Sequence, residues 1–281
     1  MISPDAAYPA PARSGFSDVD AAPDPDWHVR YLDAAAQAPG IGEWKEIARS
    51  LLAPQPGACL LDAGCGTGAD AFALARDVGP TGSVVGVDLS ARMTAEARRR
   101  AAAQAAGGDA LPVAFAQASL TALPFAAAAF DGCRAERVLH HLDNPAAALA
   151  ELARVTRPGG RVVVMDGDLD SIIIDAGDRD VTRRIVHFVA DGRAQPWGAR
   201  HLPALFREAG LHAVTVVPHT QVITSLRHSD VNPDTADAAC RAGAITAAEA
   251  APWSADIRAR DAAGAFFQTM TLFTVAGCVP A

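Results

Sequence analysis

The sequence predicts an α/β fold in which a parallel sheet is covered by helices on both faces. Short apolar segments of strand length alternate with segments of helical periodicity along the first 166 residues, which is typical of successive βαβ units. The segment 161–165 includes three consecutive valines, as expected of a strand buried on both faces. A glycine-rich turn follows the first predicted strand and begins a helix, where open α/β sheets commonly bind ligands.

The elements of the first half follow one another in a regular order. Two helices are predicted before the first strand, with a break near Pro39–Gly40, and Ser90 is expected to cap a later helix. Strands are predicted at 58–62, 83–88, 113–116, 130–135 and 161–165, the last ending at Asp166, and helices at 69–78, 91–106 and 145–155, with a turn at 158–160.

The second half is less regular and is expected to add embellishments to the same domain. Helices are predicted at 181–189 and 202–209, long strands at 212–223 and 266–279, and an alanine-rich helical segment at 232–262. We expect residues 51–281 to form one domain, with inserts at about 170–200 and 225–262 covering a substrate pocket. Residues 1–50 are expected to form an arm and a helical lid, and the Pro- and Ala-rich residues 1–25 to order poorly or only over a ligand.

Composition excludes several classes of protein. The chain has 24 basic and 32 acidic residues, a net charge of −8, which disfavours binding to nucleic acid. No apolar run reaches the ~20 residues that span a bilayer, and no signal peptide opens the sequence, so a membrane or secreted protein is not expected. Five cysteines without a CxxC pair argue against a zinc ribbon and a disulfide framework, and they suit a reducing cytoplasm. No metal site is expected. Heavy use of arginine and alanine is typical of a GC-rich bacterial genome.

The glycine-rich turn and two acids predict the kind of ligand. Gly64, Gly66 and Gly68 alternate after a buried strand, so backbone N–H groups can approach a ligand without interference from a Cβ atom. This spacing differs from the Gly-x-Gly-x-x-Gly of dinucleotide sites. Asp62 precedes the turn and suits an amine, while Asp88 ends the second strand and suits the hydroxyls of a ribose. Together they favour a nucleoside with a cationic, amine-bearing tail, such as S-adenosylmethionine.

Four motifs resemble those of the class I S-adenosylmethionine-dependent methyltransferases, in the small-molecule branch (methyltransferase type 11, similar to enzymes of ubiquinone and menaquinone biosynthesis). They are the segments 60–68 (LLDAGCGTG), 86–93 (GVDLSARM), 123–131 (LPFAAAAFD) and 138–160, which contains VLHHL and PGG. The resemblance covers about residues 55–168. It implies a Rossmann-like, mostly parallel seven-stranded sheet of order 3-2-1-4-5-7-6, with the last strand antiparallel.

The resemblance also implies a set of cofactor contacts. The glycine turn would flank the methionine moiety, Asp88 would bind the ribose, and Leu89 and Met93 would border the adenine. Ser119 stands where the family often has an acid, so the contact to the adenine amine is expected to be weaker. The expected cofactor-binding residues are Tyr31, Asp62, Gly64, Cys65, Gly66, Gly68, Asp88, Leu89, Met93, Ser119, Leu120 and Glu136.

Candidate catalytic residues follow strand four. His140 and His141 lie at the carboxyl edge of the predicted sheet, and Asp166 ends the neighbouring strand at the same edge. A histidine oriented by a carboxylate can deprotonate a hydroxyl during methyl transfer. The alternative interpretation is that the two histidines only pack or cap the following helix. Arg134, Glu136 and Arg137 form either an ion pair beside the sheet edge or a contact to the substrate or the methionine end.

These observations favour O-methylation of a small, rather apolar metabolite. The alternatives are N- or C-methylation, a cyclase or decarboxylase that keeps the cofactor for structure, and a binding protein without chemistry. Methylation of nucleic acid conflicts with the charge, so the expected partner is a small-molecule acceptor rather than nucleic acid or a membrane. The expected assembly is a monomer or a homodimer.

Overall fold

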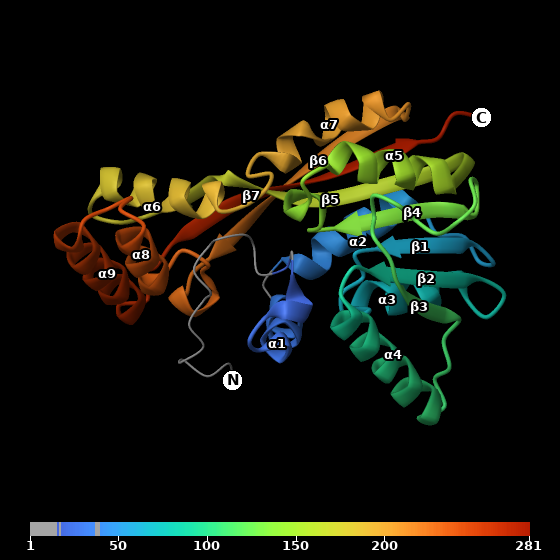
Figure 1. The fold of residues 1–281 in the computed structure, drawn as a ribbon, viewed down its shortest axis with the longest axis horizontal. Helices are drawn as coiled ribbons and strands as arrows, with labels where there is room; N and C mark the ends of the chain where they lie inside the picture. Colours follow the sequence, from blue (N-terminus) through green and yellow to red (C-terminus); the bar gives the residue numbers. More distant parts are fainter. Residues whose placement is uncertain (1–15, 17, 37–39) are drawn as a thin grey trace.

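The computed structural model describes residue 16, residues 18–36 and residues 40–281 (Figure 1). The strands are β1 (Cys59–Ala63), β2 (Ser83–Asp88), β3 (Val113–Gln117), β4 (Phe130–Glu136), β5 (Thr156–Ile174), β6 (His212–Ile223) and β7 (Gln268–Cys278). They form a seven-stranded sheet of order β3-β2-β1-β4-β5-β7-β6. β1 to β5 run parallel, and β7 lies antiparallel between β5 and β6. The predicted order and the predicted antiparallel strand are therefore confirmed.

The helices cover this sheet and one extension of it. They are α1 (Pro25–Ala35), α2 (Ile41–Leu52), α3 (Ala69–Val78), α4 (Ala91–Ala106), α5 (Pro145–Val155), α6 (Arg179–Asp191), α7 (Gly198–Glu208), α8 (Pro233–Arg241) and α9 (Ala247–Ala262). Short 3-10 turns are η1 (Val19–Ala21), η2 (Leu139–His141) and η3 (Leu226–His228). As expected, Ser90 caps α4, since its hydroxyl accepts a hydrogen bond of 3.1 Å from the Met93 N–H.

Alternating side chains of the strands divide the core into two layers. Leu61 packs with α5 and α7 on one face of the sheet, whereas Leu60 packs with α2 and α3 on the other. Both leucines are buried, as are the three valines 162–164 of β5, which alternate between the same layers. Burial on both faces is the reason why these strands read as continuous apolar runs.

A third core lies beyond the parallel strands. β5, β6 and β7 extend past the ends of β1–β4 and carry α6, α8 and α9, which lie together at one end of the molecule (Figure 1). Trp253 of α9 is buried there and donates a hydrogen bond of 2.9 Å from its indole N–H to the Thr182 hydroxyl of α6. Helices α6, α8 and α9 therefore build an apolar lobe against the extension of the sheet.

Two predictions about β5 were wrong. The strand was expected at 161–165 and to end at Asp166, but it runs from Thr156 to Ile174, because β7 pairs with it far beyond the end of β4. The expected turn at 158–160 is part of this strand, although Gly159 has a φ of 76°. Asp166 still lies at the carboxyl edge of the parallel sheet, one residue past the Met165 that pairs with Glu136.

The N-terminal segment has helical conformation in part of the residues that the structure describes. Residues 1–15 and 17 lie outside the described residues, so the expectation for that part stays a prediction. From Asp18 onward the chain forms η1 and then α1, and both contact the rest of the protein. None of the helices within residues 18–36 and 40–281 is long and apolar enough to cross a membrane.

Candidate active site

A cavity of about 780 Å³ lies at the carboxyl ends of the parallel strands. One half is lined by the glycine turn, the end of β2 and the segment after β4. The other half is lined by the extended ends of β5–β7 and by residues 191–194 and 227–230 from the two inserts. Because α1 contributes to the lining from the opposite side, the cavity lies between the sheet and the N-terminal helices.

The glycine turn is held close to its neighbours. Gly64 and Gly66 line the cavity with φ angles of 75° and 51°. The N–H groups of Gly64 and Cys65 both donate to the Val87 carbonyl, at 2.7 and 2.9 Å. A Cβ atom on Gly64 would lie 2.2 Å from a methyl carbon of Val138, so no larger residue fits there without movement. The turn therefore presents bare backbone to the cavity.

Asp88, at the end of β2, forms a second part of the wall in the half of the cavity that the glycine turn lines. Its carboxylate accepts hydrogen bonds of 2.9 Å from the N–H groups of Gly66 and Ser90, and it lines the cavity. Burial raises the pKa of Asp88, and these N–H donors partly offset the rise. The next residue, Leu89, leaves 56% of its surface exposed. A carboxylate beside an exposed apolar side chain suits a ligand with both hydroxyls and a flat apolar ring.

Beneath the turn lies a buried network of charges. Arg134 approaches Asp62 at 4.0 Å and Asp70 at 3.1 Å, and it pairs closely with Glu136. Lys45 joins the network at 2.8 Å from Asp70 and 3.5 Å from Glu136. One oxygen of Asp62, Oδ2, is buried without a hydrogen bond. Burial raises the pKa of Asp62 to about 7, although Arg134 acts in the opposite direction.

His140 is oriented by a fully buried carboxylate. Its Nδ1 forms a short hydrogen bond with Asp166 Oδ1, while its backbone N–H donates to Asp166 Oδ2 at 3.0 Å. The Gly167 N–H donates to the same carboxylate at 3.0 Å. With Nδ1 occupied, Nε2 is the ring nitrogen left to exchange a proton in the cavity. The expected His–Asp pair therefore forms, and it contains His140 rather than His141.

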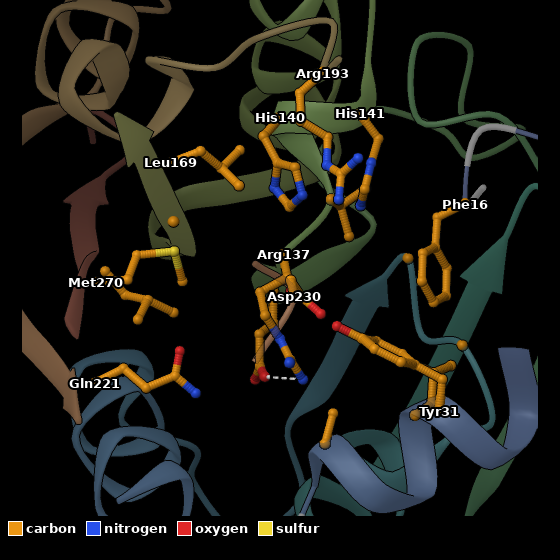
Figure 2. Close-up of a pocket in the computed structure, with 18 of the residues that line it drawn as sticks. Phe16, Tyr31, Arg137, His140, His141, Leu169, Arg193, Gln221, Asp230 and Met270 are labelled. Carbon is orange, nitrogen blue, oxygen red and sulfur yellow. Dashed lines mark ion pairs between the residues drawn. The ribbon is translucent and has the colours of Figure 1, made fainter. Parts of the chain in front are cut away.

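His141 lies beside this pair in a more cationic environment. Its ring centroid is 3.8 Å from that of His140. Burial lowers the pKa of His141 well below its ordinary value, and His140, Arg193 and Arg137 lower it further. This environment therefore favours the neutral form of His141. Figure 2 shows His140, His141 and Arg193 together on one side of the cavity, opposite Tyr31.

Residue 16, η1 and α1, together called the cover, place aromatic side chains over the first half of the cavity. The rings of Trp27 and Tyr31 stack with centroids 5.2 Å apart, and Phe16 lies 5.5 Å from Tyr31 and 5.7 Å from His141. All four side chains line the cavity. A methyl group of Leu32 would lie 3.0 Å from a Cβ atom on Gly66, so α1 rests directly on the glycine turn.

Acidic residues of this cover bind α4 and its N-cap. Asp20 accepts hydrogen bonds from the Ser90 hydroxyl at 2.5 Å and from the N–H groups of Ala91 and Arg92 at 2.8 and 3.1 Å. Asp26 pairs with Arg92 at 2.5 Å, and Asp33 with Arg100 at 2.8 Å. These contacts lie next to Asp88 and attach the cover to the rim of the cavity.

Most of the predicted cofactor residues meet in this cavity. Those that line it are Tyr31, Gly64, Gly66, Asp88, Leu89, Met93, Ser119, Leu120 and Glu136, together with His140 and His141. Four predicted residues do not line it. Asp62 and Asp166 are buried and are not among the lining residues. Cys65 is buried 3.0 Å from the Cβ position of Gly86, and Gly68 packs against Phe115.

Sequence reasoning missed the residues of the second half of the cavity. Figure 2 shows them converging from distant segments: Leu169 of β5, Arg193 after α6, Gln221 of β6, Asp230 after η3 and Met270 of β7. No local motif marks them, because the antiparallel pairing of β7 with β5 and β6 brings these segments together. Among the described residues, no group of three or more His, Cys, Asp or Glu side chains is arranged to hold a metal ion.

Comparison with known proteins gives the family. A family model described as a methyltransferase domain matches residues 61–164. An uncharacterized 37.1 kDa protein in transposon TN4556 of Streptomyces fradiae is 36% identical over 268 residues, covering 93% of this chain and 73% of that protein. The 2-phytyl-1,4-naphtoquinone methyltransferase of Trichormus variabilis is 33% identical over 150 residues, covering 48% of this chain and 64% of that protein. The chain belongs to the class I S-adenosylmethionine-dependent methyltransferases.

A solved structure agrees with the family at the level of the fold. The YcgJ protein of Bacillus subtilis superposes with a TM-score of 0.58 at 19% identity, covering 84% of this chain and 98% of that one. The sequence resemblance is therefore confirmed for family and fold. The match spans just under two thirds of the length of the quinone methyltransferase.

The residues of this methyltransferase fit the family's cofactor. The turn at Gly64 leaves a space that a Cβ atom would fill, and the bare Oδ2 of Asp62 is a buried acceptor that an ammonium group can use. Asp88 and Leu89 offer an acceptor and an apolar surface within the same wall.

We predict that Gly64→Ala impairs cofactor binding more than Gly159→Ala. Both glycines have positive φ, 75° and 76°, but a Cβ atom on Gly64 meets Val138, whereas one on Gly159 meets nothing within 4 Å. Both variants carry backbone strain of about 1 kcal/mol or more, and only Gly64→Ala adds overpacking of about 1–3 kcal/mol. Urea unfolding and calorimetric titration with S-adenosylhomocysteine measure the two effects. Equal losses in both variants would contradict the close approach to Val138.

We predict that Asp20→Ala speeds cofactor dissociation by about tenfold, because three hydrogen bonds that hold the cover to α4 are lost. Trp27 in α1 gives a fluorescence signal for stopped-flow measurement. Asp18→Ala is the matched control, since the Asp18 side chain caps nothing. The same dissociation rate in both variants would show that Asp20 does not hold the cover closed.

Proposed function

We propose that this methyltransferase transfers a methyl group to a hydroxyl of a small, rather apolar metabolite. The observation that carries the proposal is the His140–Asp166 pair, which lies where the two halves of the cavity meet. Methyl transfer itself needs mainly proximity and alignment of donor and acceptor. A base fixed at this junction is what an oxygen acceptor needs in addition, because its proton must leave during attack.

The chain's own residues divide the work of holding the cofactor. When bound, S-adenosylmethionine supplies an electrophilic methyl group on a sulfonium. We propose that the turn at Gly64 and Gly66 surrounds the methionine moiety, with Asp62 bonding its ammonium group through Oδ2. Asp88 would accept the ribose hydroxyls, and Leu89 would border the adenine. The burial of Asp62 and the position of Asp88 at the cavity wall support these roles.

His140 is proposed as the base and Asp166 as its positioning residue. The bond from Nδ1 to Asp166 fixes the tautomer with the proton on Nδ1, so Nε2 accepts the proton of the acceptor hydroxyl. The Asp166 carboxylate, itself held by two backbone N–H groups, then stabilises the imidazolium. Burial and the neighbouring cations lower the pKa of His141 and so disfavour its charged form, which leaves His140 as the proposed base.

The cover and the inserts are proposed to exclude water from the junction. Residues 1–50 would act as the lid through α1, and the inserts at 170–200 and 225–262 would form the acceptor chamber. Residues from all three segments lining one cavity support this division.

The decisive experiment incubates the protein with S-adenosylmethionine and a panel of hydroxylated, aminated and carbon-nucleophile metabolites. Mass spectrometry should find a gain of one methyl on a hydroxylated acceptor, with release of S-adenosylhomocysteine. Methylation only of amines or carbons would replace O-methylation by the N- or C-methyltransferase alternative. Tight cofactor binding without transfer to any acceptor would instead favour a cyclase or decarboxylase on the same scaffold.

We predict that His140→Gln lowers kcat by about a hundredfold or more, because general-base assistance typically contributes that much. Asp166→Asn should lower kcat in the same direction, because Asn cannot stabilise the imidazolium. His141→Gln is the matched control and should reduce kcat by less than about tenfold. Affinity for S-adenosylhomocysteine, measured calorimetrically, should stay unchanged in all three. A His140→Gln enzyme with full activity would exclude a base at this position.

We predict that cofactor affinity rises as the pH increases from about 5.5 to 7, because Asp62 must lose a proton to pair with an ammonium group. Burial raises the pKa of Asp62 to about 7, so the folded, cofactor-free chain holds a proton that the unfolded chain releases. The stability that Asp62 contributes is therefore present at low pH and declines as the pH rises toward 7. In Asp62→Asn, affinity should be weaker and this pH dependence should disappear. Calorimetric titration across this range tests both, and an unchanged slope in the variant would exclude Asp62.

A further inference from the structure

The acceptor half of the cavity contains charged groups that the proposed catalysis does not use. Arg137, Arg193 and Asp230 come from three separate segments of the chain and line the chamber beside His140. Figure 2 shows Arg193 next to His141, and Arg137 and Asp230 together between His140 and Tyr31. Arg137 and Arg193 both lower the pKa of His141 and the pKa of Asp230, so the four side chains form one cluster.

Asp230 points to a ligand with a hydrogen-bond donor. Its carboxylate lines the cavity and forms no hydrogen bond or close ion pair with any other residue that the structure describes. Burial raises the pKa of Asp230, and Arg193 and Arg137 act against that rise. Enclosed carboxylates are normally satisfied by several donors. A hydroxyl of the acceptor is the donor that such a group accommodates.

The two guanidinium groups point to an acceptor oxygen that carries negative charge. Arg137 is paired with Glu136 at 3.2 Å and still faces His141 and Asp230. Other charged or titratable groups that line this chamber are Asp191, Arg227 and His228. A cation within a few ångströms lowers the pKa of a nearby hydroxyl. A lowered pKa makes deprotonation by a histidine feasible for a phenol, whose ordinary pKa is about 10. An aliphatic alcohol remains too weak an acid even beside the two cations.

The remaining walls suit a flat apolar body. Leu169, Ile172 and Met270 line the chamber on the side of the sheet extension. Phe16 of the cover reaches the boundary of the chamber, since its ring centroid lies 5.7 Å from that of His141. Thioether sulfur and aromatic edges make favourable contacts with an aromatic ring. The chamber thus combines an apolar slot with a charged end beside His140.

Resting on the methyltransferase function proposed above, we propose that the acceptor is an aromatic compound with two hydroxyls. One phenolic hydroxyl faces His140 and the guanidinium groups of Arg137 and Arg193. The second donates a hydrogen bond to Asp230. The chamber is therefore specific for a dihydroxylated aromatic over a monophenol or an alicyclic alcohol.

The transfer balances with the groups present. The phenolic O–H bond breaks and its proton passes to His140 Nε2, while the oxygen electron pair forms the new bond to the methyl carbon. The bond between that carbon and the cofactor sulfur breaks, and its electron pair stays on sulfur as a neutral thioether. No oxidant or further reactant is required.

The test uses 4-nitrophenol and 4-nitrocatechol with protein saturated by S-adenosylhomocysteine. The anions of both dyes absorb visible light, so their ionisation in the site is read directly. We expect the apparent pKa of each bound dye to fall by about one unit. We also expect 4-nitrocatechol to bind about tenfold more tightly than 4-nitrophenol, because its second hydroxyl reaches Asp230.

Three variants separate the parts of the proposal. Arg193→Gln should move the pKa of the bound dyes back toward its ordinary value, because only Arg137 then remains, and Asp230→Ala should abolish the tenfold preference for the catechol. Arg207→Gln is the matched control, because Arg207 is exposed on α7, contacts the Pro203 carbonyl and does not line the cavity. It should behave as the unmodified protein in both measurements.

The outcomes that overturn the proposal are distinct from those that overturn the methyltransferase function. Failure to bind S-adenosylhomocysteine would remove both. If that compound binds, the acceptor class alone is wrong when neither dye binds, when the dyes bind with their ordinary pKa, or when trans-1,2-cyclohexanediol displaces them at equal concentration. An Asp230→Ala protein that retains the catechol preference would likewise exclude Asp230 as its acceptor.

Discussion

The absence of side chains at Gly64 and Gly66 is the constraint on which the rest of the site depends. Val138 lies against the Cβ position of Gly64 and Leu32 against that of Gly66, so the segment after β4 and helix α1 both pack on bare backbone. Because Gly66 is unobstructed, its N–H also reaches the carboxylate of Asp88. The glycine turn thus positions Val138, Leu32 and Asp88 around the cofactor half of the cavity. A single Cβ atom on the turn would displace at least one of these three residues.

The two halves of the cavity differ in how their charges are satisfied. Beneath the turn, Arg134 and Lys45 form ion pairs with buried carboxylates, so part of the negative charge of that half is balanced before a cationic ligand enters. In the acceptor half, Asp230 lies in a cluster with two arginines and has no direct partner among the described residues. Preorganised groups of this kind act on charge that develops during reaction, since they need not reorient. Ion-paired charges therefore lie near the cofactor, and a carboxylate without a direct partner among the described residues lies near the acceptor.

The sequence predicted the features that depend on local spacing. The alternation of strands and helices, the glycine turn, Ser90 as a cap and the pairing of a histidine with Asp166 follow from residues whose neighbours are set by a parallel βαβ order. What it missed depends on pairing between distant segments. The length of β5 is set by β7, about a hundred residues later, and that extension brings Met270 to the cavity. The contact of Asp20 with the start of α4 joins residues 70 positions apart without any motif. No periodicity encodes such contacts.

The only lysine of the chain lies in the buried charge network, and this gives the protein an unusual chemical property. Reagents that acylate side-chain amines have a single target, Lys45, and its ammonium group is engaged by Asp70 and Glu136. Because these ion pairs hold the side chain and it is only 20% exposed, a reagent should reach it slowly while the network is intact. Any event that loosens the network would accelerate the acylation. The extent of labelling at Lys45, measured by peptide mapping, therefore reports whether the charge network beneath the glycine turn is intact.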